Sequence, residues 1–141
     1  MKLTDVVPNL IVSDIDRSAA FYRDVLGFST VTTVPEQAPF VFVWLKRGEV
    51  SVFLNAVAGL GDDLPALASR PIGGTATLFI TIEADSTASG IDALFSSVTA
   101  DNGHVPVLMP LKDQFYGMRE FAIQDPDGYV VIFAQSIAMH A

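Results

Sequence analysis

The sequence predicts an α+β fold made of two modules that share one element order, strand–helix–strand–strand–strand. The first observation behind this prediction is that the order recurs in both halves of the chain, which is the pattern of an internal structural repeat. The second is the turn Asp125-Pro126-Asp127-Gly128, whose flanking runs are rich in Phe, Tyr, Ile and Val. Proline presets such a turn, aspartate bonds its own backbone and glycine accepts a positive φ, so a β-hairpin is expected to close the second half.

The first predicted module covers about residues 5–56. It opens with a short strand at Val6–Val12. Ser13-Asp14 can cap the following helix, whose apolar residues recur at helical spacing and which ends before Gly27, a suitable residue just past a helix end. Three strands follow, predicted at Phe28–Val34, Phe40–Leu45 and Val50–Asn55, with turns at Glu36–Pro39 and Lys46–Glu49.

A long connection, with a helical turn predicted near Leu64–Ser69, leads to a second module at about residues 74–136. Its expected elements are a strand at Thr75–Glu83, a helix at Asp85–Asn102, a strand at Val105–Met109, a loop at Pro110–Tyr116 and the closing hairpin. Corresponding positions in the two halves are Val7 and Thr77, Gly27 and Gly103, and Phe53 and Ile132. The identity between the halves is too low to prove a duplication, so a single ferredoxin-like or other α+β arrangement is the alternative.

Length and composition limit the class of protein. The chain has 141 residues, half of them hydrophobic, which suits one globular domain over residues 1–141. Its net charge of −8 argues against nucleic acid or an anionic membrane as a partner. No apolar run approaches the roughly 20 residues of a membrane span, and the N-terminus lacks the pattern of a signal peptide, so we expect a cytoplasmic protein. The absence of cysteine excludes disulfides and thiolate metal sites.

Two motifs carry a family resemblance that covers nearly the whole chain. Asn9-Leu10-Ile11-Val12-Ser13-Asp14-Ile15-Asp16-Arg17-Ser18, with Phe21-Tyr22 and Val25-Leu26-Gly27-Phe28, resembles the opening of the vicinal oxygen chelate superfamily. That superfamily includes glyoxalase I, bleomycin resistance proteins and extradiol dioxygenases. The segments from Tyr116 to Phe121 and from Asp125 to Tyr129 resemble its closing hairpin. The resemblance implies paired βαβββ modules, each curling a four-stranded sheet into half of an open cup that holds the ligand, and a homodimer.

The resemblance also implies four positions for metal ligands, which are His, Gln or Glu in the metal enzymes of the superfamily. Here these positions carry Val7, Phe53, Thr77 and Ile132. A catalytic Zn, Ni or Fe site needs about three ligands from His, carboxylate or thiolate, so no metal and no other cofactor is expected. The two histidines, His104 and His140, are predicted to be exposed bystanders.

No other catalytic constellation stands out. The chain has no Gly-rich phosphate loop and no nucleophile elbow. The paired carboxylates Asp62-Asp63 and Asp125/Asp127 fall in a connection and a turn, where solvated turn chemistry explains them. The sequence therefore names no catalytic residue.

Strand alternation predicts what lines the cup once the four positions above are taken to point inward. Leu10, Val12, Leu78, Ile80 and Ile82 then face the helices. Phe40, Phe42 and Trp44 share one face, placed in the cup, although ordinary core is an equal alternative for these aromatics. Arg119 has a second interpretation as a structural salt bridge with a nearby Asp or with a partner chain. The predicted ligand-binding residues are Asn9, Phe42, Trp44, Phe53, Asn55, Phe79, Phe115, Tyr116 and Arg119.

Such a cavity suits a small planar or aromatic ligand, and the acidic chain adds a preference for a cation. The first hypothesis is therefore a metal-free binding protein of the bleomycin resistance type, which sequesters its ligand without catalysis. The second is a metal-dependent lyase or dioxygenase of the same superfamily, and the four substituted positions favour the first. A third is a domain that serves a partner protein or regulates expression.

Overall fold

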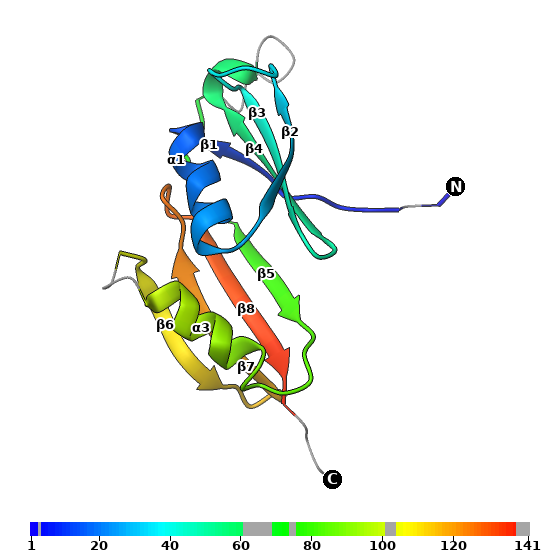
Figure 1. The fold of residues 1–141 in the computed structure, drawn as a ribbon, viewed down its shortest axis with the longest axis vertical. Helices are drawn as coiled ribbons and strands as arrows, with labels where there is room; N and C mark the ends of the chain where they lie inside the picture. The colour runs from blue at the N-terminus through cyan, green and yellow to red at the C-terminus, as the bar shows by residue number, and fades with distance from the viewer. Residues whose placement is uncertain (3, 61–68, 74–75, 101–103, 138–141) are drawn as a thin grey trace. The chain divides into compact units, whose positions relative to one another are not determined.

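The computed structural model describes residues 1–2, 4–60, 69–73, 76–100 and 104–137. The chain divides into two compact units, Met1–Gly73 and Gly74–Ala141. Each unit holds a four-stranded mixed sheet and an α-helix, so the predicted α+β fold and the repeated element order are confirmed (Figure 1). The predicted helical turn near Leu64–Ser69 falls mainly outside the described residues.

The sheet of the first unit has the strand order β1-β4-β3-β2. Strand β1 runs parallel to β4, and the other neighbours are antiparallel. Two short helical segments, η1 and η2, flank the strands. The elements are β1 (Asn9–Val12), α1 (Ile15–Ala20), η1 (Phe21–Val25), β2 (Ser29–Val34), β3 (Phe42–Arg47), β4 (Val50–Ala56) and η2 (Val57–Gly59).

Helix α1 begins and ends as its sequence predicts. The Asp14 side chain accepts a hydrogen bond of 3.1 Å from the backbone N–H of Arg17, which satisfies one of the free donors of the first turn. The helix continues as one π-helical turn, η1, and the chain then leaves it through Gly27 with a φ of 74°. The Arg47 guanidinium donates to the carbonyl of Leu26, at 2.6 Å, and so holds the helix end against β3.

One face of the first sheet is buried and the other is open. Alternate residues of β3 and β4, among them Val43, Leu45, Val52 and Leu54, are buried with the apolar residues of α1 and η1. Leu10 and Val12 of β1 are buried on the same side, as predicted. Their neighbours in the strands therefore lie on the opposite face, which none of the described helices of this unit covers.

The sheet of the second unit repeats this arrangement with the order β5-β8-β7-β6, and β5 is parallel to β8. Helix α3 lies across one face of it, where Phe95 meets Phe121 edge-on with ring centroids 5.1 Å apart (Figure 1). The elements are β5 (Thr77–Ile82), α3 (Ile91–Thr99), β6 (Val107–Asp113), β7 (Met118–Gln124) and β8 (Val130–Ser136).

The closing hairpin has the predicted turn. The buried Asp125 side chain accepts hydrogen bonds from the backbone N–H groups of Asp127 and Tyr129, both at 2.9 Å. Gly128 has a φ of 89°, which only glycine adopts without strain. The turn thus joins β7 to β8 with its backbone groups satisfied.

Several predicted boundaries were wrong; the first strand, for example, begins at Asn9 and not at Val6. The expected loop at Pro110–Tyr116 is strand as far as Asp113, because β6 is an edge strand, where a proline does not break the ladder. The helix expected from Asp85 begins only at Ile91. Before it, the backbone N–H of Ser89 donates to the Ser86 hydroxyl at 3.1 Å, which favours a turn over a helix.

Among the described residues, no helix combines the length and apolar character that crossing a membrane requires.

Candidate functional site

The open face of the first sheet carries a cluster of three aromatic rings. Phe42 and Trp44 come from β3 and Phe53 comes from β4, and all three are half-buried. The Phe53 ring lies 5.1 Å from Phe42 and 5.7 Å from Trp44, centroid to centroid, and meets Trp44 edge-on. Trp44 and Phe53 are direct cross-strand partners. The three rings lie on one face of the sheet and are partly exposed, whereas Phe40, which was predicted on the same face, precedes β3.

Polar groups border these rings on the same face. Asn9 of β1 and Asn55 of β4 are joined by a side-chain hydrogen bond, which Asn55 Nδ2 donates to Asn9 Oδ1. The indole N–H of Trp44 donates to the hydroxyl of Ser51 at 3.0 Å. Because each amide spends only part of its hydrogen-bonding capacity here, both retain donors and acceptors for a ligand. We call Asn9, Phe42, Trp44, Ser51, Phe53 and Asn55 the aromatic face.

The remaining predicted aromatic residues belong to the second unit. Phe79 of β5 is 55% exposed on the face of its sheet opposite α3. Phe115 and Tyr116 lie in the turn between β6 and β7, with relative exposures of 94% and 51%. Their rings meet edge-on at 5.1 Å. Large aromatic side chains with this exposure are available to a ligand.

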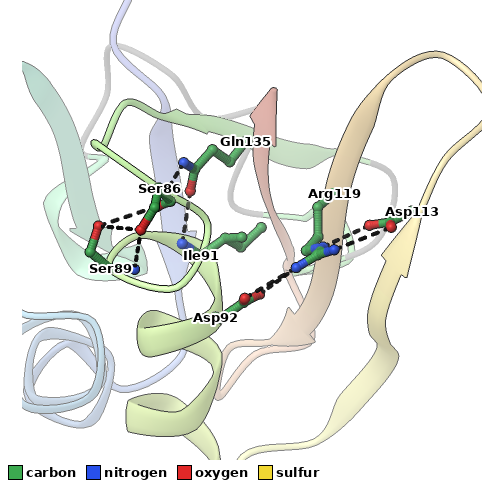
Figure 2. A network of polar contacts seen from close by, with 7 residues as sticks. All are labelled: Ser86, Ser89, Ile91, Asp92, Asp113, Arg119 and Gln135. Atoms are coloured by element: carbon green, nitrogen blue, oxygen red, sulfur yellow. Dashed lines mark hydrogen bonds and ion pairs between the residues drawn. The ribbon is translucent and has the colours of Figure 1, made fainter. Parts of the chain in front are cut away.

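Arg119 does not share that open side. It lies on the helix side of β7, where its guanidinium contacts Asp92 of α3 at 3.1 Å and Asp113 of β6 at 2.7 Å (Figure 2). The hydrogen bond from Arg119 holds the pKa of Asp113 below its ordinary value, and the two carboxylates raise the pKa of Arg119. The geometry therefore matches the second interpretation of Arg119, a structural salt bridge with nearby aspartates.

Sequence reasoning missed one residue, Glu120. It is 3% exposed, and its cross-strand partners on β7's two sides are Ala134 of β8 and Lys112 of β6. Tyr116 donates its phenolic hydrogen to Oε1 at 2.8 Å, while Oε2 is buried without a partner. This hydrogen bond raises the pKa of Tyr116. The sequence carries no local signal for this burial, because Arg119 and Gln124 of the same strand are also polar.

The residues at the four metal-ligand positions do not fit a metal. Val7 precedes β1, and Phe53 lies within the aromatic cluster. Thr77 and Ile132 lie on the face of the second sheet opposite α3, in the same alternation as Phe79. The described part of the chain holds no group of three or more His, Cys, Asp or Glu that could bind a metal ion. His104 is exposed, and His140 lies outside the described residues.

Comparison with known proteins agrees with this architecture. The profile of the Glyoxalase/Bleomycin resistance protein/Dioxygenase superfamily matches residues 5–133. The chain is 34% identical to a bleomycin resistance protein of Geobacillus stearothermophilus, over 93% of this chain and 96% of that one. Bleomycin resistance proteins of Staphylococcus aureus match to the same extent.

Solved structures have the same fold. One is a protein of unknown function from Agrobacterium tumefaciens, with a TM-score of 0.72 at 27% identity, covering 97% of both chains. Another is TioX from Micromonospora sp. ML1, with a TM-score of 0.72 at 22% identity, covering 95% of this chain and 99% of that one. With its repeated βαβββ units and a profile match over nearly its whole length, the chain belongs to the Glyoxalase/Bleomycin resistance protein/Dioxygenase superfamily.

Proposed function

We propose that the chain is a metal-free small-molecule-binding protein of the bleomycin resistance type. It sequesters a planar or aromatic organic ligand, cations included, and performs no catalysis. The observation that carries this proposal is the aromatic face: three half-buried rings beside amide and hydroxyl groups, on a strand surface left uncovered by the helices that the structure describes in this unit. Ligand sites combine apolar walls with a few convergent polar groups in this way.

The physical gain from such a surface comes from burial of the rings. A planar ligand packed on Trp44 and Phe53 removes apolar area from water, and each side chain that is fully covered contributes about 1.5–3 kcal/mol. Asn9 and Asn55 would fix the orientation of the ligand through their amides. The net charge of −8 would attract a cation over distance, and the ring faces favour a cation on contact.

A metal-dependent lyase or dioxygenase is the less favoured function. Both activities need a cation held by several His, carboxylate or thiolate ligands. Valine, phenylalanine and isoleucine at three of the four corresponding positions offer no lone pair, and the threonine at the fourth is a poor ligand. The relatives at 34% identity carry the name of a resistance protein, which also supports binding over catalysis.

The proposal includes a homodimer in the cytoplasm. The absence of cysteine is compatible with a reducing compartment, and two-fold symmetry is the common arrangement for soluble oligomers.

The tryptophan of the aromatic face allows a direct test, because Trp44 is the one tryptophan of the chain. Bleomycin and a panel of small planar aromatic compounds would be titrated against the protein, with tryptophan fluorescence and calorimetry as readouts. We expect a saturable change in fluorescence that matches a calorimetric isotherm with at least one of these compounds.

Variants then locate the site. Trp44→Ala and Phe53→Ala are each expected to weaken binding by about 1–3 kcal/mol, roughly 5- to 150-fold. Asn55→Ala should weaken the binding of compounds that bear polar groups more than the binding of plain hydrocarbons. Leu108→Ala, which shortens an exposed apolar side chain on β6, is the control and should leave affinity unchanged. Unchanged affinity in folded Trp44→Ala and Phe53→Ala would refute the site.

A further inference from the structure

Glu120 is a buried carboxylate in which one of the two oxygens accepts no hydrogen bond. Its exposure is 3%, and Oε2 has no hydrogen-bond partner. Moving a carboxylate out of water is costly unless a counter-charge or hydrogen bonds replace the lost hydration. Here one hydrogen bond, from Tyr116 to Oε1, is the replacement. The fold thus keeps an expensive charge that its own side chains compensate only in part.

The nearby cations do not neutralise this charge. Arg119, the preceding residue, points to the other side of β7 and is engaged by Asp92 and Asp113. Lys112, the cross-strand partner on β6, is exposed, and among the described residues no ion pair joins it to Glu120. Neither Arg119 nor Lys112 therefore supplies a counter-charge for Oε2.

One aromatic side chain contacts the carboxylate, and a second packs against the first. Tyr116 is bonded to it directly and is 51% exposed, and Phe115 packs edge-on against Tyr116 at 5.1 Å while 94% exposed. A carboxylate with adjacent ring faces recognises an organic ammonium or amidinium group, since the carboxylate supplies charge and hydrogen bonds and the rings supply cation–π attraction. Because the Tyr116 hydroxyl already donates to Oε1, the open position is Oε2.

We propose that Glu120, Phe115 and Tyr116 form a subsite for an organic cation, in which Oε2 of Glu120 accepts from an ammonium, amidinium or guanidinium group of the ligand. The subsite lies within the second unit, whereas the proposed function rests on the aromatic face of the first, so each can hold or fail by itself. The subsite assigns a positive charge to the group that binds there and names the carboxylate that selects it. Oε2 is buried in this structure, so binding of the cation requires the side chains around it to move.

The test uses two probes of one shape and different charge, naphthalene-2-carboxamidine, which is a cation at pH 7, and the neutral naphthalene-2-carboxamide. Each is titrated calorimetrically into the wild type, Glu120→Gln, Trp44→Ala and Lys112→Met. The glutamine variant keeps the acceptor for Tyr116 and removes only the charge. We expect the wild type to bind the amidine at least about tenfold more tightly than the amide, as loss of one charge-assisted hydrogen bond implies.

Glu120→Gln should abolish this preference and leave affinity for the amide within about twofold. Lys112→Met should keep the preference, because Lys112 is not the partner of Oε2. Thermal unfolding provides the control for folding, and removal of a poorly compensated buried charge should leave the unfolding midpoint of Glu120→Gln unchanged or raise it.

The outcomes separate this inference from the proposed function. An amidine preference that survives in Glu120→Gln, or an amidine that does not bind the wild type at all, overturns the cation subsite. If Trp44→Ala weakens binding of both probes but Glu120→Gln leaves the preference for the amidine unchanged, the aromatic face is supported and the subsite is wrong. If the preference depends on Glu120 but Trp44→Ala changes nothing, the subsite stands and the aromatic face is not the binding surface.

Discussion

Single residues fix the closing hairpin, and Asp125 is the main one. Its buried carboxylate accepts hydrogen bonds from the backbone N–H groups of Asp127 and Tyr129. Its own backbone N–H donates to the Tyr129 carbonyl at 2.9 Å. Hydrogen bonds to an ionised acceptor are stronger than neutral ones. This residue type at this position was predictable, because aspartate followed by proline and glycine specifies a turn before any tertiary contact forms.

Asp125→Ala should lower the free energy of unfolding by about 2–3 kcal/mol, since it leaves two backbone donors without their charged acceptor. Asp125→Asn keeps an oxygen acceptor and should cost about half as much. Urea unfolding at pH 7 followed by circular dichroism provides both values. Equal stability of the alanine and asparagine variants would show that the carboxylate does not hold the turn.

The strand face of a residue could be predicted from the sequence, but the burial of a single polar side chain could not. Trp44, Phe42 and Phe53 could be assigned to one face by alternation, and Asn9 and Asn55 with them. Glu120 was not found, because its burial depends on which side of β7 it faces and on a hydrogen bond from a turn residue four positions away. Local patterns do not contain such information.

At the scale of elements, the start of α3 depends on a side chain from another strand. The N-cap position is Gly90, which offers no side-chain acceptor. Gln135 of β8 supplies the missing acceptor, because its Oε1 accepts from the Ile91 N–H at 2.9 Å. Its Nε2 donates to the Ser86 carbonyl at 3.1 Å (Figure 2). A side chain at Gly90 would collide with Gln135. The late start of this helix could not be predicted, because its cap lies 44 residues away in the sequence.

Gln135→Leu is expected to destabilise the protein by about 1–3 kcal/mol, because it leaves the buried Ile91 N–H unpaired, whereas the Ser86 carbonyl still accepts from the Gly90 N–H at 3.0 Å. Gln135→Glu keeps the acceptor for the Ile91 N–H and loses the donor, so it should lower the free energy of unfolding by less than Gln135→Leu does. Chemical denaturation measures the difference, and hydrogen exchange at Ile91 reports the cap itself. Protection of Ile91 in Gln135→Leu as strong as in the wild type would contradict this role.

The Arg119 ion pairs join three elements of the second unit, and they predict a pH dependence. The pKa of Asp113 is lowered in the folded state by the hydrogen bond from Arg119, so the pair stabilises the fold above the ordinary value of 3.8. That stability is lost as the pH falls through the lower folded pKa. Asp113→Asn should therefore melt earlier than the wild type at pH 7, with the difference shrinking below pH 3.8.

The magnitude of this effect should be small, because Asp113 is exposed and salt screens exposed pairs. Melting curves from pH 2 to pH 7, at low and high salt, measure it. A difference between the two proteins that persists unchanged at pH 2 would mean that the side chain acts by some means other than its charge.

At the scale of the whole molecule, the repeated element order was the strongest signal in the sequence. Both units show it, and their sheets have corresponding strand orders, β1-β4-β3-β2 and β5-β8-β7-β6. The prediction succeeded because hydrophobic periodicity and turn residues are local properties. The extension of β6 through Pro110 was missed, since only the position of that strand at a sheet edge makes the proline acceptable.

We predict a homodimer, because open edge strands invite pairing and the family resemblance implies this assembly. Sedimentation equilibrium at micromolar concentration should report twice the chain mass of 15.1 kDa. A mass of one chain across the whole concentration range would contradict the prediction.

Trp44 fluorescence should be measured in protein that has been treated with a chelator and shown by elemental analysis to be free of Zn, Ni and Fe. A ligand found by the aromatic screen is expected to change this fluorescence saturably, near one equivalent per chain, and Phe53→Ala is expected to weaken the binding by roughly 5- to 150-fold. Binding that disappears on chelation and returns with one equivalent of metal, or binding that leaves the fluorescence of Trp44 unchanged, would contradict metal-free binding at the aromatic face.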